Sequence, residues 1–329
     1  MASEPLISVR NLSKQFSIST GKKLRKTQFT AVNDVSLSIR KGEVFGLVGE
    51  SGCGKSTLAM LILRLMNASG GSIFYKDAEI SGLTYGQMRQ FRRNMQIVFQ
   101  DPYDSLDPRF NLWQIMEEPL KIQNQGTKNE RRERITELFR MVGLGPELLK
   151  RYPHQLSGGQ RQRLCIARSL ILSPEFLVCD EAVASLDVSI QAQILNLLLD
   201  LKDELDLTYL FISHNLAVVK FVSDRIGVMY FGNLVELADT DELFRNVGHP
   251  YTAALLSAVP DPDPTSEKQR EIMLSGVPSL IDPPGGCVFH PRCSHAADQC
   301  RLEAPELREL GSGHFIACHK AGAGPGGAA

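Results

Sequence analysis

The stretch GESGCGKST, residues 49–57, has residue types and a spacing that suit the binding of phosphate groups. It fits the pattern G-x-x-x-x-G-K-[ST] and lies between an apolar run, EVFGLVG, and a helix-like run, KSTLAMLILRLM. Its glycines let backbone N–H groups turn toward phosphate oxygens, and the positive end of the following helix faces the same anion. Lys55 adds a charge for the β and γ phosphates, and the Ser56 hydroxyl can bind Mg2+. The pattern predicts a nucleotide site, with a chance glycine-rich turn as the alternative.

Two carboxylates follow a second apolar run, FLVCDE, residues 176–181. Asp180 is predicted to join the Mg2+ shell, and Glu181 to orient or deprotonate the attacking water, a role that contributes roughly 10²- to 10⁴-fold in rate. The alternative is that both acids cap the next helix. Beside a phosphate loop, the pair favours hydrolysis over nucleotide storage.

A third motif, LSGGQRQR, occupies residues 156–163. Ser157, Gly158 and Gly159 precede a long helical run, so they offer a hydroxyl and backbone amides to an anion at a helix N-terminus. Two phosphate-binding helix ends that serve one nucleotide from opposite sides would most simply come from different subunits.

These motifs, in this order, resemble the ATP-binding subunit of ABC transporters over nearly the whole chain. The pattern is also matched by Gln100 in VFQDP, Asp187 in ASLD and His214 in ISHN. The resemblance implies a head-to-tail dimer with ATP between one phosphate loop and the partner's signature motif. It assigns Gln100 to Mg2+ and the attacking water and His214 to the γ-phosphate. Phe16 resembles the aromatic residue that stacks on adenine, with a core position as the alternative.

The residues assigned to the nucleotide by this resemblance are Phe16, Gly49, Ser51, Gly52, Cys53, Gly54, Lys55, Ser56, Thr57, Ser157, Gly158, Gly159, Gln160 and Asp187. Ser56, Gln100 and Asp180 are assigned to Mg2+, and Glu181, His214 and Gln100 to catalysis. Ala182 and Asn215 depart from the usual proline and aspartate, and neither position has an assigned chemical role.

Finer features resemble the peptide importer group, the ATPases of dipeptide and oligopeptide uptake. They are QDPYDSLDPR, DVSIQAQILNLL, DRIGVMYFG and, most specifically, GHPYTAALLSAVPDPDP. The resemblance implies a related second ATPase subunit in a heterodimer, two transmembrane permease subunits and, indirectly, an external solute-binding protein. The substrate is not encoded in this chain, so importers of glutathione or nickel complexes stay open. We expect residues 101–109 to dock on the permease.

Composition sets limits on location and partners. A hydrophobic fraction of 43% over 329 residues supports a full core. With 36 basic and 37 acidic residues, the net charge of -1 provides no field for nucleic acid. The longest apolar run, LAMLILRLM, is too short to span a bilayer, and the start of the chain lacks the pattern of a signal peptide. We expect a peripheral protein on the cytoplasmic side of the inner membrane.

The order of the motifs indicates an α/β fold: a P-loop nucleotide-binding domain of the ABC type, with a helical insertion and a small cysteine-bearing C-terminal extension. We expect the ATPase domain over 1–258 with its helical subdomain at about 101–170, the extension over 259–320, and a disordered tail at 321–329. ABC-type ATPases that act on nucleic acid or ribosomes are the alternative class. The chain shows neither sustained heptads nor a second cassette, and its basic stretch GKKLRK, 21–26, is predicted to be a solvated loop.

Four of the seven cysteines lie near the C-terminus, namely Cys287, Cys293, Cys300 and Cys318. A disulfide framework requires an oxidising compartment, so it is disfavoured. The spacing C-x5-C-x6-C-x17-C contains no short zinc pair, although His290, His295, His314 and His319 could serve as zinc ligands. Thiols without a role are a further alternative. The pattern resembles the C-terminal segment of peptide importer ATPases that carry a [4Fe-4S] cluster, which we expect to be structural.

Overall fold

The computed structural model describes residues 4–19, 26–101, 105–258, 283–311 and 313–321. The basic stretch 21–26, the proline-rich linker after 258 and the tail after 321 lie wholly or mainly outside these residues. The chain divides into two compact units. The first contains Arg40–Glu43 and Gly82–Ile212, and the second contains Ile7–Ile39, Val44–Ser81 and the chain from Ser213 onward.

The first unit is built on a parallel sheet with strand order β6-β7-β8. Its strands are β6 Met95–Val98, β7 Phe176–Asp180 and β8 Thr208–Ile212. Every residue of β7 and β8 is buried, which is why these segments are continuous apolar runs rather than alternating ones. β7 ends at the buried carboxylate Asp180, whereas β8 ends at the apolar residue Ile212.

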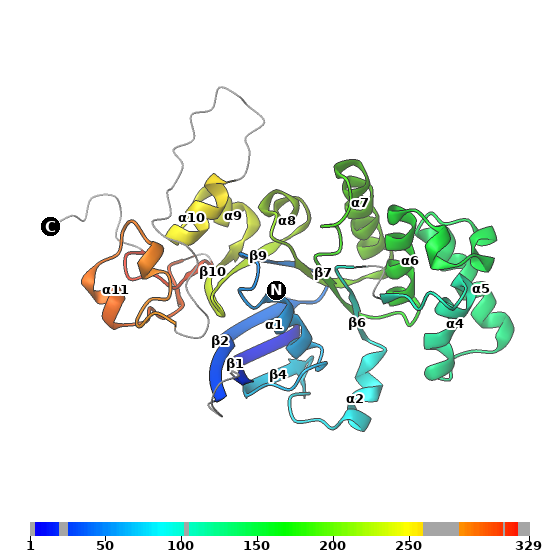
Figure 1. The fold of residues 1–329 in the computed structure, drawn as a ribbon, viewed down its shortest axis with the longest axis horizontal. Coiled ribbons are helices and arrows are strands. Elements are labelled where there is room, and N and C mark those ends of the chain that lie inside the picture. Colours follow the sequence, from blue (N-terminus) through cyan, green and yellow to red (C-terminus); the bar gives the residue numbers. More distant parts are fainter. Residues whose placement is uncertain (1–3, 20–25, 102–104, 259–282, 312, 322–329) are drawn as a thin grey trace. The chain divides into compact units, whose positions relative to one another are not determined.

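Helices make up the rest of the first unit. They are α2 Tyr85–Arg92, α4 Leu112–Ile122, α5 Lys128–Met141, α6 Gly158–Leu170 and α7 Val188–Leu205, with short 3-10 turns η1 Pro146–Lys150 and η2 Pro153–Gln155. Between β6 and β7, α4, α5 and α6 pack against one another (Figure 1). Each of these three helices starts with a capping box, from Asn111, Thr127 and Ser157 respectively. The local sequence therefore determines where they begin.

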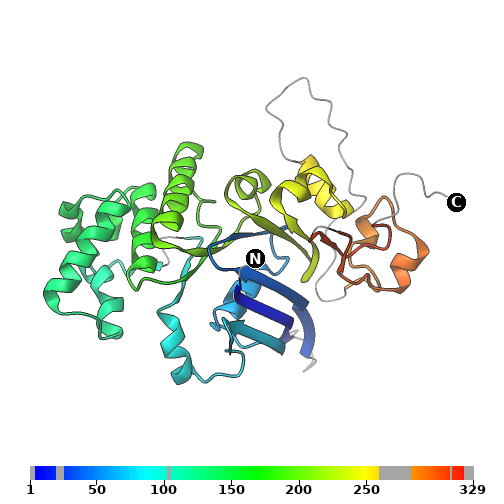
Figure 2. The ribbon, with the colours of Figure 1, turned by 180° about the vertical axis from the view of Figure 1, so that it is seen from behind.

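The second unit contains two sheets. One has the order β2-β1-β4-β5, with β2 Lys26–Arg40, β1 Pro5–Ser19, β4 Gly70–Tyr75 and β5 Ala78–Glu79. In the other, β3 Val44–Val48 runs parallel to β9 Arg225–Tyr230, and β10 Asn233–Asp239, β12 Phe315–Ile316 and β11 Arg308–Glu309 follow in antiparallel pairs. The C-terminal extension thus joins the sheet through β12. Figure 2 shows β1, β2 and β4 side by side from behind.

The helices of the second unit are α1 Lys55–Ile62, α8 Leu216–Val222, α9 Thr240–Arg245, α10 Pro250–Ser257 and α11 Asp298–Leu302, with the turn η3 His290–Arg292. Asn215 caps α8 by accepting hydrogen bonds from the N–H groups of Ala217 and Val218. The asparagine at this position therefore has a structural role. Among the described residues, no helix combines the length and apolar character needed to cross a bilayer.

Candidate nucleotide-binding site

The phosphate loop joins the buried strand β3 to helix α1. Gly49 and Gly54 have φ angles of 152° and 106°. A β-carbon on Gly49 would lie 2.2 Å from the carbonyl oxygen of Met229, and one on Gly54 would lie 2.2 Å from that of Ala31. The backbone of neighbouring segments leaves no space for a side chain, so both positions require glycine.

Lys55 turns back over this loop. Its Nζ atom donates to the carbonyl oxygens of Gly49, at 2.8 Å, and Glu50, at 3.0 Å, and the residue is only 5% exposed. Gly54, before α1, supplies no side-chain acceptor, and the first turn contains no acidic residue. The N-terminal N–H groups of α1 can therefore face an anion without a competing carboxylate in that turn.

The other loop positions differ in exposure. Ser51, Gly52 and Ser56 are exposed, whereas Thr57 is half-buried. Cys53 is buried, its sulfur lies 3.8 Å from Lys55 Nζ, and burial raises the pKa of its thiol. Ser56 stays a predicted Mg2+ ligand, and Cys53 is buried within the loop.

The two carboxylates stand at the end of β7. Asp180, the last residue of the strand, is 6% exposed. Glu181 follows with a left-handed φ of 48°. Gln100 donates a hydrogen bond from Nε2 to Glu181 Oε2 at 3.0 Å. The structure therefore brings together two of the three residues predicted for catalysis.

The signature motif forms the start of α6. Ser157 is the N-cap: its hydroxyl accepts from the N–H of Gln160, and the Gln160 side chain accepts from the N–H of Ser157. A β-carbon on Gly159 would lie 2.9 Å from a methyl group of Ile190, in the first turn of α7. Gly158 has ordinary contacts only. Glycine at 159 thus permits the close approach of two helices whose N-termini carry Ser157 and Asp187.

Asp187 caps α7. It accepts from the N–H of Ile190 at 3.0 Å and the hydroxyl of Ser189 at 2.8 Å, and these bonds lower the pKa of its carboxyl. In the second unit His214 is exposed, directly before the cap of α8. Phe16 stacks on Phe29, with ring centroids 5.3 Å apart. Phe16 is half-buried, so the structure supports neither of its two predicted roles over the other.

The predicted residues are divided between the units. The first unit carries Gln100, the signature motif, Asp180, Glu181 and Asp187, and the second carries Phe16, the phosphate loop and His214.

The four C-terminal cysteines belong to one segment of the second unit. Cys300 is buried and the other three are half-buried, and the N–H of Cys287 donates to the carbonyl oxygen of Cys300 at 2.8 Å. Burial raises the pKa of the Cys287 thiol to about 11, and the charges of Cys300, Cys318 and Cys293 add to the increase. Within the described ranges, however, no group of three or more His, Cys, Asp or Glu side chains is arranged to hold a metal ion. The cluster stays a prediction.

Three of the four histidines predicted as possible zinc ligands, His290, His314 and His319, have partners other than these thiols. His290 Nδ1 lies 2.9 Å from the carbonyl oxygen of Cys287, and His319 Nε2 lies 3.0 Å from that of Glu303. His314 Nε2 lies 2.8 Å from the carboxylate of Glu236. The side chain of Glu236 is fully buried and also accepts from the N–H groups of Gly248 and His249. This carboxylate therefore fastens the extension to β10.

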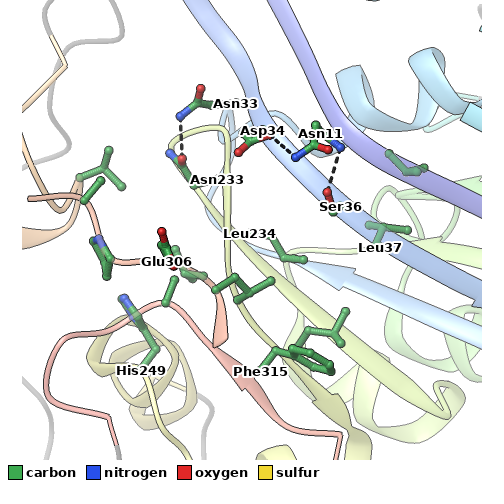
Figure 3. Close-up of a pocket in the computed structure, with 18 of the residues that line it drawn as sticks. Asn11, Asn33, Asp34, Ser36, Leu37, Asn233, Leu234, His249, Glu306 and Phe315 are labelled. Carbon is green, nitrogen blue, oxygen red and sulfur yellow. Dashed lines mark hydrogen bonds between the residues drawn. The ribbon is translucent and has the colours of Figure 1, made fainter. Parts of the chain in front are cut away.

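A pocket of about 820 Å³ in the second unit contains none of the predicted nucleotide residues. Its walls come from β1, β2, β10 and the extension (Figure 3). At its polar end Asn33 donates to Asn233, and Asn11 donates to Asp34, both at 2.9 Å. These side chains satisfy one another, and the pocket is separate from the phosphate loop.

Sequence reasoning missed three residues that contact the loop or anchor the extension, namely Tyr251, Arg292 and Glu236. One signal in the sequence was available: Glu50 is an acidic residue within an anion-binding loop. Its negative charge indicates that a basic residue neutralises it. Its partner could not be identified from a position 242 residues away in the sequence.

The geometry defines an α/β ATPase of the P-loop class, with a signature motif at the N-terminus of a second helix. Residues 32–184 match the ABC transporter family, and residues 235–300 match the family described as oligopeptide/dipeptide transporter, C-terminal region. The chain belongs to the ABC transporter family, as one of its ATP-binding subunits.

Similar proteins support this membership. A putative peptide import ATP-binding protein of Brucella ovis is 48% identical over 318 residues, covering 97% of this chain and 98% of that protein. The oligopeptide transport ATP-binding protein AppF of Bacillus subtilis is 49% identical over 320 residues, covering 96% and 97%. Among solved structures, cbiO1 of Clostridium perfringens, part of the ABC transporter complex cbiONQ, has a TM-score of 0.64 at 25% identity, covering 74% of this chain and 92% of that one. The ATP-binding cassette MJ0796, a dimer bound to ADP and Pi, has a TM-score of 0.62 at 28% identity, covering 71% and 98%.

Proposed function

We propose that this protein hydrolyses ATP to power the import of peptides through a membrane permease. The observation that carries the catalytic part is the Glu181 carboxylate at the end of β7, held by the side-chain amide of Gln100. The similarity to peptide import ATP-binding proteins over nearly the whole chain supports the peptide part.

The residues then have the following roles. The amides of residues 49–57 and Lys55 bind the phosphates, and Phe16 and His214 contact the adenine and the γ-phosphate. Ser56, Gln100 and Asp180 would hold Mg2+, which neutralises charge that develops on the phosphates. Glu181 accepts the proton of the attacking water, and Gln100 orients it. Ser157, Gly158, Gly159, Gln160 and Asp187 complete the site of a second, related subunit in a head-to-tail dimer.

The proposed assembly contains this subunit, its partner ATPase and two permease subunits, on the cytoplasmic side of the inner membrane. Residues 101–109 are the proposed docking surface, although 102–104 lie outside the described residues. Closure of the dimer would move the helical segment that follows Gln100 and so transmit force to the permease.

Uptake tests this proposal. Cells that lack the chromosomal copy are supplied with the wild-type protein or with Lys55→Ala, and uptake of labelled dipeptides and oligopeptides is measured beside labelled glutathione and a nickel complex. Peptide uptake restored by the wild type alone supports the proposal. If the wild type restores uptake of only glutathione or the nickel complex, the proposed peptide substrate is wrong. If the protein co-purifies with nucleic acid or ribosomes instead of a permease, the proposed transport function is wrong.

We also propose that Cys287, Cys293, Cys300 and Cys318 bind a structural [4Fe-4S] cluster. The occurrence of all four cysteines in one segment with little regular structure supports this assignment, because ligand bonds would add to the stability of the segment. Anaerobic purification should give a brown protein with about four irons per chain. A colourless protein with stoichiometric zinc would overturn the assignment.

A further inference from the structure

Glu50 places a carboxylate in a loop that is built to bind an anion. Its N–H donates to the hydroxyl of Tyr251 at 2.8 Å, and its carbonyl oxygen accepts from Lys55 Nζ at 3.0 Å. The backbone of Glu50 is therefore held on both sides. Its negative charge, however, would repel phosphate groups unless another residue neutralised it.

Arg292 of the C-terminal extension pairs with this carboxylate. Its Nη1 atom lies 2.8 Å from Glu50 Oε2, and its Nη2 atom lies 2.9 Å from Oε1. The two side chains are 6% and 24% exposed. A bidentate ion pair between largely buried side chains is stronger and more directional than an ion pair on the surface.

The guanidinium packs on Tyr230, which belongs to a cluster of aromatic rings. Tyr230 at the end of β9, Tyr251 on α10 and Phe289 beside η3 form a cluster with ring centroids 4.6–5.5 Å apart. The Arg292 guanidinium lies 5.8 Å from the Tyr230 ring centroid, and Nη1 lies 3.5 Å from its hydroxyl. A long, flexible side chain is thereby fixed before any nucleotide binds.

We infer that the C-terminal extension forms part of the nucleotide site, with Arg292 as a positioning residue that neutralises Glu50 and holds the phosphate loop in its binding conformation. The inference rests on the proposed ATPase function. Arg292 acts through Glu50 and touches no reacting atom. Its loss leaves an uncompensated carboxylate in the phosphate loop and removes one of the contacts that hold Glu50, the others coming from Tyr251, Lys55 and the N–H of Cys53.

The test compares ATP affinity in the full-length variants Arg292→Gln and Arg292→Gln/Glu50→Gln, by equilibrium titration with a fluorescent ATP analogue. We expect the Kd of Arg292→Gln to rise about tenfold, because an uncompensated charge near the phosphates weakens binding by this order. The KM for ATP should rise with it, while kcat changes less. The double variant should recover most of the affinity, since it removes the repelling charge as well. A merely structural role for Arg292 would give no such recovery.

Arg245→Gln is the matched control. Arg245 also pairs with a carboxylate of the second unit, Asp241, but at 3.8 Å and with side chains 75% and 80% exposed. It should bind ATP as the wild type does.

Two results would overturn the inference: wild-type affinity in Arg292→Gln, or a double variant that binds no better than the single one. If Arg292→Gln does not fold, Arg292→Lys keeps the charge but loses the paired geometry, and its Kd should lie between wild type and tenfold. A Kd raised more than tenfold in that variant would overturn the inference, because the retained charge should still neutralise Glu50. A wild-type protein that fails to bind ATP would instead refute the proposed function.

Discussion

Gln100 and Glu181 are 81 positions apart in the sequence, yet the Gln100 amide donates to the Glu181 carboxylate at 3.0 Å. Glu181 also has left-handed backbone, with φ at 48°, immediately after β7. Backbone and hydrogen bond together determine where this carboxylate points. The proposed base is thus oriented by the same residue that is proposed to position the water.

Glu181→Gln should separate hydrolysis from binding. The amide cannot take the proton of the attacking water, so turnover should fall by roughly a hundredfold or more. The Kd for ATP should stay within about twofold, because the phosphate loop is unchanged. Phosphate release and nucleotide titration measure the two quantities. Glu204→Gln, an exposed residue of α7, is the control, and near wild-type turnover in Glu181→Gln would place the base elsewhere.

Gly54→Ala and Gly52→Ala should differ sharply. Both glycines have positive φ, 106° and 80°, so alanine costs roughly 1–2 kcal/mol of backbone strain at either site. At Gly54 the new methyl group would also lie 2.2 Å from the Ala31 carbonyl oxygen, whereas at Gly52 it meets nothing within 4 Å. Thermal unfolding should therefore show a larger loss of stability for Gly54→Ala, accompanied by loss of ATP binding. Equal losses would contradict the packing argument.

Glu236→Ala should destabilise the second unit. The Glu236 carboxylate, with a fully buried side chain, accepts from the N–H of Gly248 at 2.7 Å, the N–H of His249 at 3.1 Å and the ring of His314 at 2.8 Å. Removing it leaves buried donors unsatisfied, and the free energy of unfolding should fall by about 3 kcal/mol in urea titrations. Asp241→Ala, with a side chain 80% exposed, should change it by less than about 0.5 kcal/mol. Similar effects in the two variants would count against this account.

His314 predicts a pH dependence of stability. The hydrogen bond to Glu236 raises the pKa of His314, and the charges of Glu236 and Glu242 add to the rise against the opposing effect of burial. The folded state therefore holds the proton more tightly than the unfolded chain does. This stabilisation is complete below the unfolded value of about 6.5 and is lost as the pH rises through the raised pKa.

The measurement compares the wild type with His314→Gln in urea titrations at pH 5.5 and pH 9. The difference in the free energy of unfolding should be larger at pH 5.5. Burial lowers the pKa of His249 to about 4, so this residue is neutral in the folded state at both pH values. His249 is present in both proteins, so its contribution cancels in this difference. A difference that grows with pH would show that His314 is not the group responsible.

Local patterns in the sequence predicted the elements that carry the proposed nucleotide site. The phosphate loop, the end of β7 and the start of α6 each depend on residues within a short stretch, where a glycine, a cap or an apolar run determines the backbone. Ser157 and Gln160 cap each other three residues apart, so their geometry follows from spacing alone. The family of the chain could be predicted for the same reason.

Other relationships were decided only by the tertiary structure. The sequence shows an acid in the phosphate loop and an arginine beside Cys293, but nothing local joins Glu50 to Arg292 across 242 residues. Their pairing requires β9, α10 and η3 to bring Tyr230, Tyr251 and Phe289 into contact. The same holds for Glu236: the pairing of β12 with β10 brings His314 to it, and the segment before α10 brings Gly248 and His249. Interactions between residues close in the sequence follow from the local sequence pattern. Pairs of residues far apart in the sequence form only through tertiary packing, which no single stretch of sequence determines.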